Sequence, residues 1–169
     1  AVNAVQMASV YATIANGGVR VQPRLIAGTT SPSGQYTAAA SSPSRRVIQA
    51  KTAHELIQIL QQVPQVNELG GQPWGVIPGY AIAAKTGTSQ ESTASCQLCE
   101  YGSSYIGMAP GNNPQVVVAV NVQDPNKKYG YFGAVVAGPV FYNVMKFALQ
   151  TLQIPPDGAV APHVRLNAP

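Results

Sequence analysis

The chain has 169 residues, of which 46% are hydrophobic and 9% are charged. This apolar content is enough for one hydrophobic core and excludes a wholly disordered chain, while the charged fraction lies far below the ~25% typical of soluble domains. The net charge of +4 comes from basic residues that stand singly or in pairs, and the absence of a basic stripe argues against a nucleic-acid-binding protein.

The low charge fits a protein that works outside the cytoplasm. No stretch approaches the ~18 continuous apolar residues of a membrane span, and the first residues lack the charged region of a signal peptide. We therefore expect the export signal or membrane anchor to lie upstream of Ala1. Because the chain starts with Ala at a predicted helix start, we expect a processed or truncated product.

The first predicted element is a helix over residues 3–16. Its apolar residues recur at helical spacing, and Gly17 with Gly18 supplies a left-handed stop. Residues 19–47 then change to short β-like runs, 19–26 and 35–37, around the turn Ser31-Pro32-Ser33-Gly34. This pattern predicts an exposed hairpin.

A second helix is predicted over residues 52–62. Thr52 and Glu55 have the spacing of a capping box, and apolar residues follow at helical spacing until Pro64. Residues 70–79 are rich in Gly and Pro and predict a loop that Trp74 anchors. His54 is predicted on the surface of this helix, and His163 is predicted to be exposed in the C-terminal tail.

Three strands are predicted next, over residues 80–89, 104–109 and 116–123. Short connections make them antiparallel neighbours, and the last is so rich in β-branched residues that we expect both its faces to be buried. A turn over 110–114 joins the last two. A final helix over 133–152, with Pro139 near its first turns, is predicted to pack across the sheet. The Pro-containing tail 154–169 is predicted to be extended and weakly ordered, which divides the chain into residues 1–153 and a tail.

The candidate site lies at the end of the first strand, at Lys85-Thr86-Gly87-Thr88. A strand edge with a cation, two hydroxyls and a glycine is suited to hold an anion. Lys85 supplies charge, Thr86 and Thr88 supply directional donors, and Gly87 has no side chain to block a peptide lying alongside. The pattern predicts that a peptide substrate adds to this edge as an extra strand.

The order of motifs resembles the class B penicillin-binding proteins, with the division-type (septal) transpeptidases as the nearest group. Lys-Thr-Gly is a motif of penicillin-binding proteins and class A β-lactamases. The resemblance extends over residues 5–18, 23–25, 104–110, 116–124 and 133–141, and so covers roughly 5–152. It implies an α/β (α+β) fold in which this chain is the C-terminal part of the transpeptidase domain, with three antiparallel strands packed by a terminal helix.

The resemblance implies a peptidoglycan D,D-transpeptidase that cross-links stem peptides through an acyl-serine intermediate and is trapped by β-lactams. Lys85 would hold the polar network between the serine and the substrate carboxylate. Thr86 and Thr88 would bind that carboxylate, and the backbone N–H of Thr88 would be one of two oxyanion donors, a contact worth ~3 to 4 kcal/mol of barrier. The family also implies division-complex membrane proteins as partners and a location at the extracytoplasmic face of the bacterial membrane.

The chain departs from the family pattern in two ways. Ala84 stands where many relatives have Gly, which removes no functional group. More seriously, no Ser-x-x-Lys is present, and no Ser stands two places before an Asn. We therefore expect the nucleophile and its base to come from the N-terminal half of the same domain, and this chain alone to be inactive.

Alternative functions remain open on the same fold. A non-catalytic penicillin-sensing or binding module would use the strand without turnover, and a β-lactamase shares the Lys-Thr-Gly strand. Residues 79–86 also come within one residue of the phosphate-binding loop pattern, but the spacer is strand-like, which argues against it. No cofactor or metal is expected.

Cys96 and Cys99 lie in the polar loop between the first two strands of the predicted sheet. A zinc site would need two further ligands, and both histidines lie far away in the sequence. A redox pair normally opens a helix in a βαβ unit, which is missing here. A local disulfide is the simplest interpretation in an oxidising compartment, with free thiols as the alternative.

Overall fold

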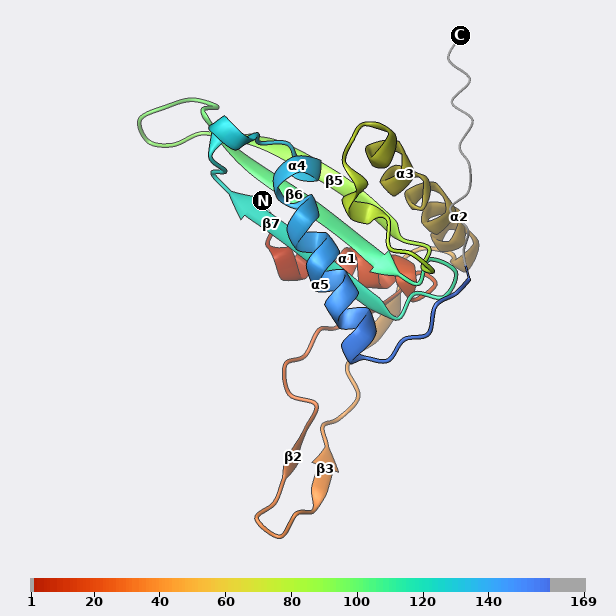
Figure 1. The fold of residues 1–169 in the computed structure, drawn as a ribbon. Coiled ribbons are helices and arrows are strands. Elements are labelled where there is room, and N and C mark those ends of the chain that lie inside the picture. Colours follow the sequence, from red (N-terminus) through yellow and green to blue (C-terminus); the bar gives the residue numbers. More distant parts are fainter. Residues whose placement is uncertain (1, 159–169) are drawn as a thin grey trace.

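A three-stranded antiparallel sheet forms the centre of the fold (Figure 1). The computed structural model describes residues 2–158. The sheet consists of β5 (Ala83–Glu91), β6 (Glu100–Ala109) and β7 (Val116–Gln123), with β6 in the middle. Helix α1 (Ala4–Ala15) packs on one face and helix α5 (Gly138–Thr151) on the other. The structure therefore confirms the predicted α/β class and the antiparallel order of the strands.

Helix α1 forms where the apolar spacing predicts it. The side chain of Asn3 accepts a hydrogen bond from the backbone N–H of Gln6, and the side chain of Gln6 accepts one from the backbone N–H of Asn3. This reciprocal cap satisfies two of the free donors at the helix start. Gly17 and Gly18 follow with φ of 59° and 86°, the left-handed geometry that stops a helix.

The predicted hairpin is confirmed and projects far from the body of the domain (Figure 1). Its stem pairs β1 (Val19–Val21) with β4 (Ser44–Arg46), and its outer part pairs β2 (Gly28–Thr30) with β3 (Tyr36–Ala38). The turn closes through the N–H of Gly34, which donates to the carbonyl of Ser31 at 2.9 Å. The predicted strand over 19–26 is too long, because regular pairing stops after Val21.

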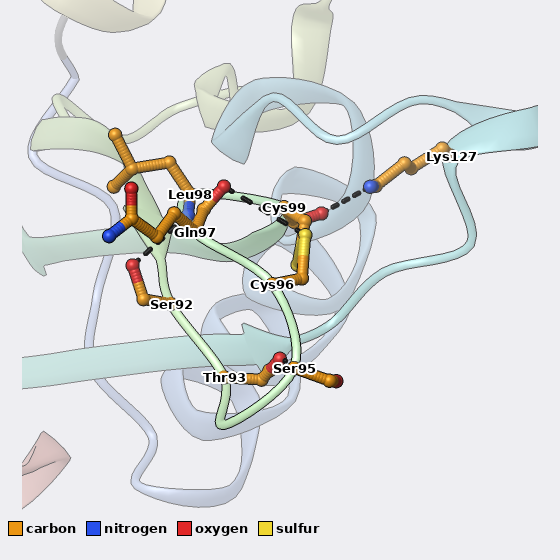
Figure 2. Close-up of a disulfide and its surroundings, with 8 residues drawn as sticks. All are labelled: Ser92, Thr93, Ser95, Cys96, Gln97, Leu98, Cys99 and Lys127. Carbon is orange, nitrogen blue, oxygen red and sulfur yellow. Dashed lines mark hydrogen bonds between the residues drawn. A yellow bond between two sulfur atoms is a disulfide. The ribbon is translucent and has the colours of Figure 1, made fainter.

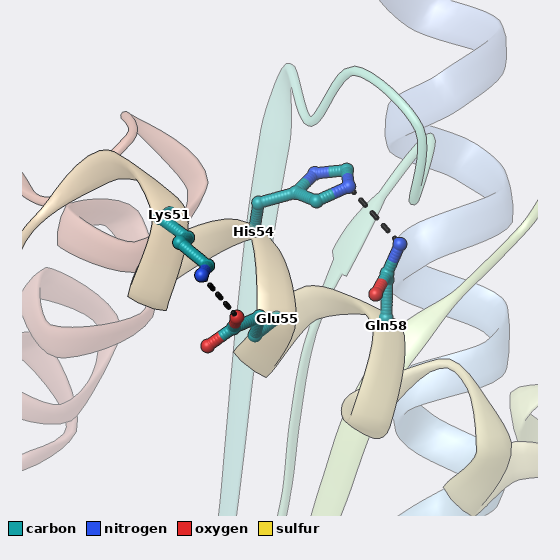
Figure 3. A network of polar contacts seen from close by, with 4 residues as sticks. All are labelled: Lys51, His54, Glu55 and Gln58. Carbon is teal, nitrogen blue, oxygen red and sulfur yellow. Dashed lines mark hydrogen bonds and ion pairs between the residues drawn. The ribbon is translucent and has the colours of Figure 1, made fainter.

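Helix α2 (Ala50–Leu60) begins two residues before the predicted start, so the predicted capping box is wrong. The N-cap is Gln49, which makes no side-chain cap. Glu55 instead pairs with Lys51 at 3.9 Å along the exposed face of the helix (Figure 3). On the same face Nε2 of His54 lies 3.0 Å from Nε2 of Gln58, which confirms the predicted surface position of this histidine.

Helix α3 (Gln62–Leu69) is a helix that the sequence pattern does not predict, because a proline after helical spacing indicates the end of a helix. Pro64 is the third residue of α3. In the first turn of a helix the N–H that proline lacks has no partner within the helix, so the residue is tolerated there. A short 3-10 turn, η1 (Pro73–Gly75), carries Trp74 in the predicted loop.

The strand bounds differ from the prediction except at β7. Strand β5 begins three residues later than expected and ends two later, while β6 begins four residues earlier. Strand β7 has the predicted bounds, but the expectation that both its faces are buried is wrong, because only Val118 is buried. As an outer strand, β7 is covered less completely than β6.

The core has one part on each face of the sheet. On the α5 side Tyr105, Phe141, Met145 and Leu149 are buried, and the rings of Tyr105 and Phe141 stack at 4.5 Å. On the α1 side Met108 packs with Tyr11 and Ile57. Both parts contact β6, which explains why this strand is the most buried of the sheet.

The predicted final helix is divided in two. A short helix α4 (Gly133–Val136) is followed by a break at Ala137 and then by α5. Pro139 lies in the first turn of α5, as predicted. No helix within residues 2–158 is long and apolar enough to cross a membrane.

The chain after α5 is held against the body rather than released. Ile154 is buried, and its carbonyl accepts a hydrogen bond of 2.7 Å from the hydroxyl of Tyr80. The carboxylate of Asp157 accepts from the backbone N–H of Ala81 at 3.0 Å. The prediction of a weakly ordered tail is therefore wrong for residues 154–157. His163, which was predicted to be exposed, lies outside the described residues.

Replacing a buried aromatic residue of α5 should test which face of the helix carries the core. Phe141→Ala is expected to lower the free energy of unfolding by about 3–5 kcal/mol, because it leaves a cavity beside Tyr105. Phe147→Ala on the same helix is the control; its side chain is 67% exposed, and we expect a loss below about 0.5 kcal/mol. Urea unfolding followed by Trp74 fluorescence measures both, and equal losses would contradict the described packing.

Alkaline pH should weaken the fold through two buried phenols. Burial raises the pKa of Tyr105, partly offset by the hydrogen bond from Asn67, and burial also raises the pKa of Tyr11. A raised folded-state pKa leaves stability unchanged below the unfolded value of about 10 and lowers it as pH rises further. The midpoint of unfolding, measured from pH 8 to pH 11, should fall toward the upper end of this range. The midpoint of the Tyr105→Phe variant should fall less steeply with pH. Identical slopes would rule out a contribution from Tyr105.

Candidate active site

Strand β5 carries the four residues of the candidate site and forms one edge of the sheet. Lys85 lies in this strand, as predicted, and its side chain is exposed. Thr86 and Gly87 are half-buried and Thr88 is exposed. Because β6 pairs with only one side of β5, the other edge has no strand beside it among the described residues. That edge leaves backbone groups open to an extended ligand.

The pleat of β5 separates the lysine from the two hydroxyls. Ala83 packs with the α1 side of the core and Ala84 with the α5 side, so the alternation that follows is fixed. Lys85 consequently faces the α1 side, whereas Thr86 and Thr88 face the α5 side. The three polar side chains therefore do not form one cluster, although the lysine amine reaches back to the strand's own backbone. The amine of Lys85 donates to the carbonyl of Thr86 at 2.9 Å.

Helix α4 fixes the hydroxyl of Thr88. The backbone N–H of Gly133 donates to Oγ1 of Thr88 at 3.1 Å. This bond occupies an acceptor position of the hydroxyl and leaves its proton available for donation. The arrangement thus fixes the Thr88 hydroxyl and leaves it free to donate a hydrogen bond.

Two glycines allow the strands and α4 to approach closely. A Cβ on Gly133 would lie 2.3 Å from the carbonyl oxygen of Ser104 and 2.5 Å from that of Gly87. A Cβ on Gly87 would lie 2.6 Å from Oγ of Ser104. A side chain at position 87 would therefore require the Ser104 hydroxyl to rotate away, whereas one at position 133 would collide with the backbone.

Aromatic residues border the site beyond Thr88. The hydroxyl of the fully buried Ser103 donates to the carbonyl of Tyr131. The rings of Tyr101 and Tyr131 stack at 4.1 Å, and the Phe132 ring lies 4.6 Å from that of Tyr131. Phe132 remains 57% exposed directly before α4. The packing of these rings holds the segment that leads to Gly133.

The loop between β5 and β6 is closed by a disulfide between Cys96 and Cys99 (Figure 2). The amine of Lys127 donates to the carbonyl of Cys99 and lies 5.3 Å from the centre of the Tyr101 ring. The structure agrees with the disulfide interpretation of these two cysteines.

A groove of about 710 Å³ lies on the α1 face of the sheet, beside the candidate residues. Its walls include the first turn of α1 together with Gly87, Ser104 and Asn121. This is the face toward which Lys85 points. The groove lies next to Gly87 and Thr88 and is open to further residues from outside the described chain.

The chain matches the family described as "Penicillin binding protein transpeptidase domain" over residues 1–146. This match covers most of the chain, and the fold and the edge strand define the same class. The chain belongs to this family, as a transpeptidase-domain sequence of the class B penicillin-binding proteins. The resemblance seen in the sequence is confirmed.

Individual relatives agree with this assignment. The chain is 33% identical to the penicillin-binding protein PbpB of Mycolicibacterium smegmatis, over 96% of this chain and 26% of that protein. It is also 33% identical to a probable peptidoglycan D,D-transpeptidase, PbpC, of Pseudomonas aeruginosa, over 93% of this chain and 26% of the relative. The chain thus spans about a quarter of the length of these relatives.

A solved structure shows the same fold. Penicillin-binding protein 3 of Mycobacterium tuberculosis, crystallised with ampicillin, superimposes with a TM-score of 0.82 at 32% identity, and covers 99% of this chain and 39% of that one. The three-stranded sheet and its helices therefore correspond to part of that longer chain.

The structure brings together residues that the sequence did not connect with the site. Lys85, Thr86, Gly87 and Thr88 were identified from their motif, but Gly133 and Ser104 were missed as supporting residues. One signal for Gly133 was present in the sequence. Ser, Thr, Asp or Asn is usual directly before a helix, but the predicted last helix has none of them there and opens with a glycine. Such a glycine indicates close backbone approach.

Two substitutions should separate the contact of Gly133 from its hydrogen bond. Gly133→Ala should lower the free energy of unfolding by about 1–3 kcal/mol, because the new methyl group collides with two carbonyl oxygens. Thr88→Val keeps the shape of the side chain but removes the acceptor, and should cost about 1 kcal/mol. Denaturant titration measures both variants. If Gly133→Ala were as stable as the parent chain, the described approach of α4 to β5 would be incorrect.

Proposed function

We propose that this chain is the C-terminal portion of a peptidoglycan D,D-transpeptidase and supplies its Lys-Thr-Gly-Thr strand. The observation that carries this proposal is the open edge of β5, with Thr86 and Thr88 on one face and Lys85 on the other. The nucleophilic serine and its base come from the preceding half of the domain. This chain by itself lacks the nucleophile and is inactive.

The stem peptide binds along β5 as an additional strand, which uses backbone hydrogen bonds for affinity. Its terminal carboxylate accepts hydrogen bonds from the hydroxyls of Thr86 and Thr88, which lie two residues apart on the same face. The Thr88 hydroxyl is already oriented by the Gly133 N–H. The backbone N–H of Thr88 donates to the oxygen of the reacting carbonyl, where negative charge develops during attack.

The reaction proceeds by acyl transfer. The serine oxygen attacks the carbonyl carbon between the two D-alanine residues, the C–N bond breaks, and the terminal D-alanine leaves with a proton on its amine. An amine of a neighbouring stem peptide then attacks the acyl-serine ester, forms the cross-link and releases the serine hydroxyl. Lys85 faces the α1 side, where its charge would stabilise the polar network around the serine.

The groove on the α1 face offers a seat for the preceding half of the domain. It lies beside Gly87 and Ser104 on the face that Lys85 occupies. A segment seated there could bring its serine to the lysine side of the edge strand, opposite the hydroxyls that hold the carboxylate. We assign residues 1–153 to the transpeptidase domain and 154–169 to its C-terminal tail.

The proposed setting is the extracytoplasmic face of the bacterial membrane, with an anchor upstream of this chain. Peptidoglycan stem peptides and β-lactams are the proposed ligands, and membrane proteins of the division complex are the proposed partners. The support is the family membership, together with the disulfide, which is typical of an oxidising compartment. A relative of known structure binds ampicillin.

Covalent labelling by a fluorescent penicillin tests the proposal on the full-length protein. The parent should form a stable adduct, and Lys85→Met should reduce the acylation rate at least about 100-fold, because charge beside the nucleophile is lost. Lys146→Met, which removes an exposed lysine of α5, is the matched control and should label at the parental rate. Labelled protein is quantified after denaturing electrophoresis.

Other outcomes would assign other functions. Failure of the full-length protein to label would contradict the proposal, as would normal labelling of Lys85→Met. Rapid loss of the label by hydrolysis would indicate a β-lactamase. A stable label without cross-linking of stem peptides in a mass-spectrometric assay would indicate a sensor.

A further inference from the structure

The net charge of the chain is concentrated in one projecting element. Residues 1–50 contain four arginines and no acidic residue, whereas the rest of the chain carries six basic and six acidic residues. All four arginines, Arg20, Arg24, Arg45 and Arg46, belong to the hairpin over residues 19–46 or its stem. The whole net charge of +4 therefore lies on this projecting hairpin.

Two of these arginines make hydrogen bonds to the backbone, and the other two make none among residues 2–158. Arg24 donates to the carbonyl of Ala40, and Arg46 donates to the carbonyls of Gly17 and Ile48. Arg20 and Arg45 are exposed and have no hydrogen-bond or ion-pair partner among residues 2–158. They are available to bind a group outside the described chain.

The two free arginines stand directly opposite each other. In the stem, Arg20 of β1 is the cross-strand partner of Arg45 of β4, so both guanidinium groups lie on the same face. Like charges in directly opposed positions destabilise a strand pair. An anion between them would relieve this repulsion, and each planar guanidinium can hold a carboxylate through two parallel hydrogen bonds.

Apolar side chains accompany the arginines. Leu25 is fully exposed, and Ile26 and Tyr36 are exposed to 66% and 60%. Tyr36 lies in β3, whereas Leu25 and Ile26 lie in the unpaired segment between β1 and β2. The two short ladders on either side of this segment project from the body and have free edges (Figure 1). Such small ladders are marginally stable in water, and a free edge can accept another extended segment.

We infer that the hairpin over residues 19–46 is a docking element for an acidic, extended segment of a partner protein. Carboxylates of the partner bind Arg20 and Arg45, its backbone pairs with a free edge of the hairpin, and its apolar side chains cover Leu25 and Ile26. Arginine and exposed apolar residues together are typical of protein interfaces, and no lysine occurs in this hairpin.

A lipid surface fits these observations less well. The turn over residues 31–35, which is the outermost part, reads Ser-Pro-Ser-Gly-Gln and has no charged or aromatic residue. Elements that bind the membrane interface expose basic and aromatic residues to the lipid. The free arginines are instead at the stem, close to the body. The hairpin also leaves the body at the end opposite α4, so a bound partner would not cover the candidate active site (Figure 1).

A binding experiment on the full-length protein tests this inference. The probe is a fluorescent synthetic peptide of alternating Glu and Thr with a central Leu, and a Gln and Thr peptide is its uncharged counterpart. The parent should bind the acidic peptide and not the uncharged one, with affinity that falls as salt rises. Arg20→Gln with Arg45→Gln should weaken binding about 100-fold, roughly tenfold for each charge-assisted contact.

Two further variants distinguish a specific surface from general charge. Lys51→Gln with Lys146→Gln removes the same charge outside the hairpin and should leave the affinity unchanged. Leu25→Ser keeps every charge and should weaken binding at least about fivefold. The thermal unfolding midpoint of the arginine variant should be unchanged or raised, because the opposed charges are gone.

Several results would overturn the inference. These are no binding of the acidic peptide by the parent, equal loss in the lysine control, or unchanged binding by Leu25→Ser. Binding to phosphatidylglycerol vesicles that depends on Arg20 and Arg45, without binding of the peptide, would assign the hairpin to the membrane instead. None of these measurements depends on acylation by penicillin, so they remain separate from the test of the proposed transpeptidase.

Discussion

The burial of β6 on both faces is the constraint on which the rest of the fold depends. Ile106 and Met108 pack toward α1, while Tyr105 and Ala109 pack toward α5. This strand also holds β5 and β7 by backbone pairing along nearly its whole length. A strand fixed in this way determines the register of its neighbour, and the register decides which side chains of β5 face each side. The position of β6 thus determines the geometry of the candidate site on β5.

Sequence periodicity predicted the elements whose stability is local. Helix α1, with its apolar stripe and glycine stop, and β7, with its run of β-branched residues, have the expected positions. The errors at the second helix arise within the helices themselves, because Glu55 pairs with Lys51 instead of capping and Pro64 lies in the first turn of a new helix instead of ending the preceding one. The error at β6 has a long-range cause. The early start of β6 follows from pairing with Glu91 at the far end of β5, which no local pattern reveals.

The candidate site shows the same division between local and distant information. The motif places Lys85, Thr86 and Thr88 on one strand, and sequence alone was sufficient for that. The alternation of faces depends on how Ala83 and Ala84 pack, and the orientation of Thr88 depends on a glycine 45 positions away. A short motif therefore identifies the chemical groups, while the sheet and α4 determine their directions. Side chains on opposite faces of β5 suit a site to which other residues are added from both sides of the strand.

The segment from Ile154 to Asp157 holds the chain after α5 against the residues just before β5. Its contacts with Tyr80 and Ala81 close a ring that contains the sheet, α4 and α5. A tensile load applied beyond Asp157 would reach the residues just before Lys85 directly, without first passing along the long helix. A polypeptide fused to this end is consequently coupled mechanically to the motif strand, and its linker should be long and flexible enough to carry no force.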